Sequence, residues 1–514
     1  MNIKNLLLPF TFALLTTWAI QYFINKHYFG IETNEGVVKS GKVFVAPQSQ
    51  LEAQPLKREI NFDDNDLIDT KSSIETSIGT DHATYVFSNK GAVLKQLIYK
   101  RNTNGEQITF STVNPHELMQ ENQNFLVVLD RVTPLNYELL NQRKTKDAYF
   151  LVYKTKNEYV SIEKQFTISR NTFQIDLDLT ITPRNETLQP RVFYSAPLIS
   201  GIKNDTISAI YNTETGSIKK EARNKLDLAK GWFSPNMFGT ESRYFIHAMT
   251  SDKNGFAQRA YYSLTGTSDI ISILEGPIVR EPAHWKLSFY MGPKEEVAVV
   301  PVDPRLEQTF EYSGWLAPLS RVLLMILKYL YKVLHNYGWA IVVMTLLINL
   351  VLLPLNIKGA RSMKKDADVQ KKLAYIQQRY KNDPEALARE RTELINKYGV
   401  PGVGGCLPKL LQLPIFFALS RVLSSSIELY HAPFLWIKDL SATDPYFILP
   451  LLIMILMIFA ATPTDPKQRF MMIAVALVFG AFAVNFSAGL CLYILVGVLL
   501  TGLQNVMQQR MNWA

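Results

Sequence analysis

Apolar runs with almost no charged residues constrain the fold of this 514-residue chain more than any other feature. The first run, residues 6–24, has about the 20 residues that a helix needs to cross roughly 30 Å of hydrocarbon. Charged residues make up only 19% of the chain, against about 25% in soluble domains, which excludes a wholly soluble protein. The pattern predicts a multi-span α-helical membrane protein with six transmembrane helices, at residues 6–24, 337–355, 410–427, 446–462, 470–484 and 488–503.

The N-terminal run has two possible roles, a retained anchor or a cleaved signal peptide. Lys4 supplies the short basic region that either role requires. The run is longer than the usual apolar region of a signal peptide, and no pair of small residues suited to cleavage follows it. We therefore expect residues 1–30 to form an N-terminal transmembrane signal anchor.

Basic residues between the second and third runs fix the orientation in the membrane. Residues 358–400 contain 11 basic and 6 acidic residues, which places this loop in the cytoplasm. With alternating loops, both termini are then cytoplasmic and the large soluble part lies outside. The loop predicts a helical hairpin whose second helix starts at Asp383 and Pro384. Its basic residues suit anionic lipid, RNA or a nascent chain, or they only set topology; those singled out are Lys364, Lys365, Lys371 and Lys372.

Alternating apolar and polar residues dominate the soluble part. Strict period-two alternation at 173–182, with similar runs at 83–88, 125–129, 148–153 and 286–290, predicts many short strands. We expect residues 81–312 to form an extracytoplasmic β-sandwich domain, preceded by a polar linker at 31–80. No carboxylate or histidine spacing distinguishes a catalytic pair from a solvated surface, so we expect no enzyme.

Residues 313–336 change to a helical period. Leucines at 316, 319, 323, 327 and 330 fall on one stripe, and basic residues fall on the other side. This layout predicts an interfacial amphipathic helix on the outer membrane surface. A core helix of the β domain is the alternative.

The two cysteines, Cys406 and Cys491, both lie in apolar stretches. The seven histidines show no metal-binding spacing. We therefore expect no disulfide framework, no metal and no cofactor.

Several segments of the C-terminal part closely resemble the YidC membrane-protein insertase family, of the Gram-negative type with a large periplasmic domain. The resemblance covers about residues 315–510 and is carried by residues 404–419, Glu428, 431–434, 436–440, 444–446, 465–466 and 488–493. It implies a five-helix insertase core at 337–510 in the bacterial inner membrane. It also implies that the chain inserts and folds nascent membrane proteins, alone or with the Sec translocon, through a hydrophilic groove open to cytoplasm and lipid.

The resemblance also directs attention to one departure from the family. Members usually carry an arginine in the second span, five residues before a proline; here the proline is Pro354 and the position holds Asn349. Arg421 in the third span is the intramembrane cation instead, and such a residue is functional by default. We expect the groove to be lined by Arg421, Asn349, Thr345, Ser424, Ser425, Thr501 and Asn505.

These residues also have purely structural interpretations. Arg421 lies close enough to the outer end of its span to snorkel to the interface, where it could pair with Glu428. The Ser and Thr residues could simply allow close helix packing.

The expected partners are nascent membrane proteins, the Sec translocon and the lipid bilayer. Some family members bind ribosomes through a long basic tail, but here residues 508–514 contain one basic residue, so ribosome binding should be weak. The alternative function is a secondary transporter with a periplasmic ligand-binding domain. Transporters usually contain internal repeats, and the sequence shows none.

Overall fold

The computed structural model divides the chain into two compact units. One unit comprises Glu35–Phe310, and the other comprises Met1–Asn34 with Glu311–Ala514. The predicted anchor at 1–30 lies outside the described residues. The structure describes residues 54–62, 73–103, 106–113, 124–130, 132–184, 187–197, 207–213, 216–265, 269–310, 316–381, 383–398, 403–460 and 466–510.

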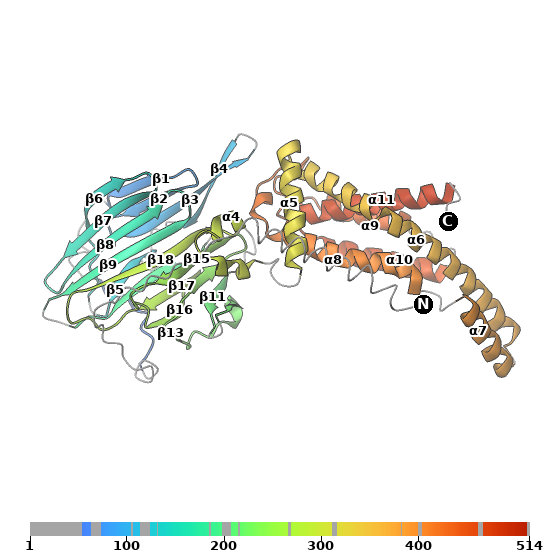
Figure 1. The fold of residues 1–514 in the computed structure, drawn as a ribbon, viewed down its shortest axis with the longest axis horizontal. Helices are drawn as coiled ribbons and strands as arrows, with labels where there is room; N and C mark the ends of the chain where they lie inside the picture. The colour runs from blue at the N-terminus through green and yellow to red at the C-terminus, as the bar shows by residue number, and fades with distance from the viewer. Residues whose placement is uncertain are drawn as a thin grey trace. The chain divides into compact units, whose positions relative to one another are not determined.

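Antiparallel strands build the first unit, in three sheets (Figure 1). The four-stranded sheet has the order β1-β2-β3-β4, formed by Glu75–Gly79, Ala83–Ser88, Val93–Thr103 and Glu106–Val113. The five-stranded sheet has the order β13-β16-β17-β10-β5, formed by Trp232–Phe233, Arg259–Thr265, Asp269–Glu275, Pro190–Ser195 and Leu126–Leu129. The nine-stranded sheet has the order β12-β11-β14-β15-β18-β9-β8-β7-β6. Its strands are Ile218–Ala222, Ser208–Asn212, Phe238–Glu241, Phe245–Asp252, Ala283–Pro293, Gln174–Pro183, Val160–Ser169, Ala148–Lys156 and Glu138–Lys144.

Alternation in the sequence becomes alternation in burial. In β9, Ile175, Leu177, Leu179 and Ile181 are fully buried, and the polar residues between them are half-buried. Such a strand buries one face against the core and leaves the other to water. The strands predicted at 83–88, 125–129, 148–153, 173–182 and 286–290 are confirmed as β2, β5, β7, β9 and part of β18. The unit is β-sandwich-like, as expected.

The prediction of a polar linker over 31–80 is wrong where the structure describes it. Residues 73–80 include β1, and Leu56, Ile60 and Phe62 pack against a buried apolar cluster of the β unit. These apolar side chains are few and lie among polar residues, so the sequence shows no period-two run there that would predict a strand. Residues 31–53 and 63–72 lie outside the described residues.

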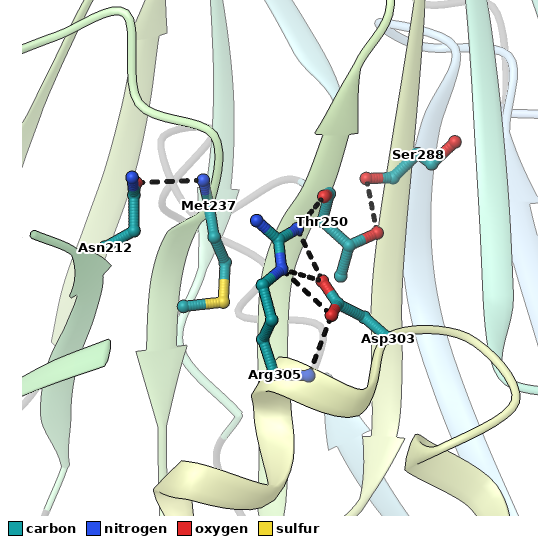
Figure 2. A network of polar contacts seen from close by, with 6 residues as sticks. All are labelled: Asn212, Met237, Thr250, Ser288, Asp303 and Arg305. Carbon is teal, nitrogen blue, oxygen red and sulfur yellow. Dashed lines mark hydrogen bonds and ion pairs between the residues drawn. The ribbon is translucent and has the colours of Figure 1, made fainter. Parts of the chain in front are cut away.

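Two short helices, α4 (Glu296–Val299) and η3 (Pro304–Thr309), follow β18; a third, η2 (Arg223–Lys225), lies earlier in the chain. Figure 2 shows how η3 is held. The Asp303 carboxylate accepts the backbone N–H of Arg305 at 2.9 Å and pairs with its guanidinium, which also donates to the Thr250 carbonyl oxygen at 2.8 Å. Because Thr250 lies in β15, this contact fixes the end of the β unit to its large sheet. In the same view, Thr250 donates to the Ser288 carbonyl, and Asn212 accepts from Met237.

Helices form the second unit (Figure 1). They are α5 (Ala317–Leu334), α6 (Tyr337–Arg379), α7 (Pro384–Tyr398), α8 (Val403–Ser425), η4 (Ile427–Leu429), α9 (Ile448–Ala460), α10 (Pro466–Ala483) and α11 (Ala488–Arg510). The predicted second span and first hairpin helix are one continuous 43-residue helix, α6, rather than two elements. Pro354 lies inside it, so this proline does not end the helix.

The hairpin and the amphipathic helix are both present. Asp383 accepts the N–H of Ala386 at 3.0 Å, which confirms the predicted cap of α7, and α7 packs back against α6. The helix α5 belongs to the second unit and packs on α6 and α8, so the alternative of a core helix in the β domain is wrong.

Only one helix among the described residues, Tyr337–Gly359 within α6, is both long and apolar enough to cross a membrane by itself. Shorter apolar helices lie at Ile448–Phe459, Phe470–Ala483 and Ala488–Gln504. The count of six spans therefore stays a prediction.

Candidate functional site

One apolar core joins the helices on which the predicted groove residues lie. Leu327 of α5, Ile341 of α6, Leu419 of α8, Ile453 of α9 and Cys491 of α11 are all fully buried in it. Burying apolar surface away from water stabilises a fold by about 25 cal/mol per Å². Between helices in lipid, the stabilisation comes from close packing of side chains instead. The core therefore sets which face of each helix is turned inward.

The loop between η4 and α9 holds the starts of two helices, α9 and α11. The Asp444 carboxylate accepts the N–H groups of Tyr446 (3.1 Å) and Leu449 (2.7 Å) and the indole N–H of Trp436 (3.2 Å). It thereby satisfies the free N–H groups at the start of α9. The backbone N–H groups of Ala488 and Gly489 donate to the carbonyls of Ala442 and Leu440, which fixes the start of α11 to the same loop.

Glu428 forms an ion pair that the sequence did not reveal. Its carboxylate lies 2.6 Å from the ammonium of Lys328 in α5, and its side chain is only 9% exposed. In place of the Arg421 that the sequence suggested, the structure pairs Glu428 with Lys328, almost a hundred residues earlier in the chain. Ser320 of α5 also donates to the Ala418 carbonyl at 3.4 Å. The two contacts attach α5 to the C-terminal part of α8 and to η4.

Thr345 and Asn349 share the buried face of α6. The Thr345 hydroxyl donates to the Ile341 carbonyl at 2.7 Å, and the Asn349 amide donates to the Thr345 carbonyl at 2.9 Å. Bonds of this kind to the preceding helical turn satisfy a polar side chain without a partner from another helix. These two residues form the polar part of an otherwise apolar interface.

Arg421 lies on a different kind of surface. Arg421 is exposed, as are Phe417 and Leu413 on the same face of α8. Ala418, Leu419 and Val422, on the opposite face, are buried. Ser424 is half-buried, and the buried Ser425 donates to the Arg421 carbonyl at 2.6 Å. The structure thus places Arg421 on the outer face of α8 and Asn349 within the packed face of α6, and it does not pair their side chains.

The remaining predicted residues lie further away along the chain. Thr501 in α11 is exposed and donates to the Gly497 carbonyl at 2.9 Å; Asn505 lies in α11, but its side chain is not described. Of the four hairpin lysines, the structure describes the side chain of Lys372, which is exposed. An apolar hollow of about 470 Å³ on α10, lined by residues such as Val475, Val478 and Phe482, shares no residue with the predicted set.

Metal-binding groups are not found in the part of the chain that the structure describes: no three His, Cys, Asp or Glu side chains converge there. The buried charges of the β unit are paired within the fold. Arg259 contacts Glu275 at 2.7 Å with both side chains at most 2% exposed, and Lys164 donates to the carbonyls of Gly91 and Phe125. Burial lowers the pKa of Lys164 well below its usual value. These groups support the sheets.

Comparison with known protein families matches both units. The family model described as "60Kd inner membrane protein" matches residues 329–513, and the model described as "YidC periplasmic domain" matches residues 75–326. These matches support, at this coarse level, the predicted inner-membrane location and the predicted periplasmic location of the β domain.

Individual relatives agree. The chain is 32% identical over 459 residues to the membrane protein insertase YidC of Geotalea uraniireducens, covering 82% of this chain and 84% of that protein. It is 44% identical over 216 residues to the protein of the same name from Campylobacter jejuni, covering 41% of each. A crystal structure described as an active YidC insertase matches at 19% identity over 85% of this chain and 93% of that one, with a TM-score of 0.37, too low to carry an argument. The curated relatives are named as insertases, not as enzymes or transporters. The chain belongs to the YidC family of membrane protein insertases.

Proposed function

We propose that this chain inserts nascent membrane proteins into the inner membrane through a polar groove bordered by α6, α8 and α11, alone or with the Sec translocon. The observation that supports the activity is the relationship over 84% of a protein named an insertase. In this proposal the chain has six spans with both termini in the cytoplasm, because that topology places the basic residues 358–400 inside.

Arg421 is the cation of the proposed groove. An arginine is costly in hydrocarbon, so an exposed one on a helix of the membrane unit needs water or an anion beside it. A hydrated cation of this kind can attract acidic residues of a client while they cross, since charges interact strongly where the dielectric is low. Thr345 and Asn349 supply polarity on the neighbouring helix α6, and Ser424, Ser425, Thr501 and Asn505 supply it on α8 and α11.

Insertion into vesicles tests the role of Arg421. Arg421→Ala should slow insertion of a client with an acidic translocated tail by about tenfold, equivalent to roughly 1.4 kcal/mol. A client with a neutral tail should be little affected, and Arg421→Lys, which keeps the charge, should retain most activity. If Arg421 only snorkels to the interface, Arg421→Ala will be nearly silent with both clients.

Asn349→Arg tests whether the charge has moved between helices. Added to Arg421→Ala, it should restore part of the insertion of the acidic client by rebuilding the usual arrangement of the family. Alone it should be neutral or harmful, because Asn349 is only 5% exposed and an arginine there would bury a second cation in the packed face of α6. A double variant no better than Arg421→Ala contradicts the shared groove.

The hairpin α6–α7 is the proposed cytoplasmic contact for the ribosome and for anionic lipid. Reversing the charge of Lys364, Lys365, Lys371 and Lys372 should reduce ribosome co-sedimentation at low salt, and raising the salt should weaken the native contact as well. Co-sedimentation that is unaffected by the reversal would contradict this role.

A further inference from the structure

Residues 54–62 run in extended form across the five-stranded sheet of the β unit. Main-chain carbonyls of residues 54 and 55 contact Arg259 of β16, that of Glu59 contacts Arg191 of β10, and Phe62 forms a bridge with Thr133, just after β5. The segment therefore crosses strands instead of pairing alongside one.

Alternate side chains of this segment face the sheet. Leu56, Ile60 and Phe62 pack on an apolar cluster of the β unit; its buried members are Val93, Leu126, Val128, Phe193, Tyr261, Ile271 and Ile273. Lys57, Glu59 and Asn61 are exposed. Arg58, between Leu56 and Ile60, is also half-buried and lies over the Tyr261 ring. The alternation is that of a bound extended peptide, in which side chains point in turn to the sheet and to solvent.

Most of the polar contacts hold the main chain of the segment; the exception is Arg58, whose guanidinium donates to the carbonyls of Leu228 and Tyr262. Arg191 donates to the carbonyls of Lys57 (2.6 Å) and Glu59 (3.3 Å), Arg259 donates to that of residue 54 (2.8 Å), and the Tyr261 hydroxyl donates to that of Lys57. The Glu275 carboxylate forms an ion pair with the Arg259 guanidinium at 2.7 Å and so holds it in place. Donors held in place in this way would accept the main chain of an extended segment, and the carbonyls of Leu228 and Tyr262 would accept a basic side chain at the position of Arg58.

Two observations separate this segment from an ordinary strand of the sandwich. Among the described residues, its pairing with the sheet is limited to the Phe62–Thr133 bridge and a 2.7 Å bond from the Thr133 N–H to the Asn61 carbonyl. The Nε of Arg191, in a side chain only 2% exposed, has no acceptor there. The site thus holds a donor that residues 54–62 leave unused.

We propose that this face of the five-stranded sheet is a binding site for an extended polypeptide segment whose inward side chains are apolar with one basic residue among them, and that residues 54–62 occupy it in cis. A tethered occupant acts at an effective concentration in about the millimolar range, so it masks the site until it is displaced. Once residues 54–62 are displaced, the site would bind an unfolded segment of another protein on the same side of the membrane as the β domain. This inference is independent of the groove in the membrane unit.

A labelled synthetic peptide of residues 52–64 tests the proposal on the full-length protein. The variant Leu56→Ser/Ile60→Ser/Phe62→Ser removes the inward side chains, and Lys57→Ser/Glu59→Ser/Asn61→Ser is the matched outward control. The peptide should bind the inward variant at least about tenfold more tightly than it binds the native protein or the control, because the competitor is gone. Adding Arg191→Met to the inward variant should remove most of that binding.

Absence of peptide binding to a folded inward variant, as judged by circular dichroism and thermal melting, would overturn the proposal and make residues 54–62 a fixed part of the fold. If that variant does not fold, the native protein is tested with excess peptide carrying a photoreactive group at the position of Ile60. Crosslinks to β10 or β16 support the site, whereas crosslinks elsewhere or none contradict it.

Discussion

Two charged residues of the helical unit, Glu428 and Arg421, differ in burial. Glu428 is buried and paired with Lys328, so its charge is neutralised locally and serves to join α5 to the end of α8. Arg421, two turns earlier on α8, is exposed. The first pair is a structural contact, and the second residue is the candidate for contact with clients.

Breaking the Lys328–Glu428 pair should destabilise the membrane unit. Glu428→Gln or Lys328→Met should each cost about 1–2 kcal/mol, less than a fully buried pair because the lysine is partly exposed. The charge swap Lys328→Glu/Glu428→Lys should recover much of the loss. Thermal unfolding in detergent measures the swap and, as a double-mutant cycle, the native protein, the two single variants and Lys328→Met/Glu428→Gln. Additive losses with no recovery in the swap would show that the pair contributes nothing.

His247 gives the β unit a sensitivity to acid. It is fully buried, its Nδ1 lies 3.0 Å from the Ser195 carbonyl, and burial lowers its pKa to about 4 from the usual 6.5. Because the pKa is lower in the folded state, the unfolded chain binds the proton first as the pH falls. Stability is therefore intact above pH 6.5 and declines by up to about 3 kcal/mol as the pH drops to about 4.

His247→Gln separates this residue from other acid-sensitive groups. The free energy of unfolding of the β unit, followed in the full chain by its near-ultraviolet signal, should fall less steeply between pH 6.5 and 4 in the variant. Equal slopes for the two proteins would mean that His247 does not titrate on unfolding.

At the scale of elements, close packing decides where helices begin. Helix α6 starts beneath the loop that joins η4 to α9, and a Cβ atom added at Gly338 would overlap the Phe434 ring. Tyr331 at the end of α5 stacks on Tyr337 with ring centroids 3.9 Å apart. The junction of α5 and α6 therefore has no spare volume.

Gly338→Ala should destabilise the membrane unit by about 1–3 kcal/mol through overpacking, despite the better helix propensity of alanine. Gly497→Ala in α11 is the matched control, because an added Cβ there meets no atom within 4 Å. Thermal unfolding in detergent should show a loss for the first variant and no loss for the second. Adding Phe434→Ala to Gly338→Ala should relieve the overlap; if both glycine variants behave alike, packing at Gly338 is not tight.

At the scale of the whole molecule, the chain forms two compact units. The groove residues, the hairpin and α5 all belong to the helical unit, whereas the β unit has its own core and its own buried ion pairs. A unit with its own core can be removed without taking support from the other.

Deletion of residues 40–300 should therefore leave insertion largely intact, while deletion of α5 should abolish it, since α5 holds α6 and α8. Complementation of a strain depleted of its own insertase measures both, with protein levels checked by immunoblotting. Loss of growth in the first deletion, with the protein still accumulating, would contradict the division.

Local pattern was enough to establish much of this protein. Apolar runs identified the membrane half, period-two alternation gave β2, β7 and β9, and Asp383 with Pro384 predicted the start of α7. Each of these depends on neighbouring residues in the sequence, where spacing and backbone preference are decisive. The motifs at 404–419 and 488–493 likewise sufficed to indicate the family.

Long-range contacts were beyond the reach of the sequence. Lys328 and Glu428 are both ordinary charged residues until the fold brings α5 to α8. Residues 54–62 looked like a polar linker because only the sheet beneath them makes Leu56, Ile60 and Phe62 an apolar face. Asn349 and Arg421, predicted as neighbours in one groove, lie on a packed and an exposed surface because the shared core fixes how α6 and α8 are turned. Helix rotation and ion-pair choice follow from packing among distant segments, and only the tertiary structure decides them.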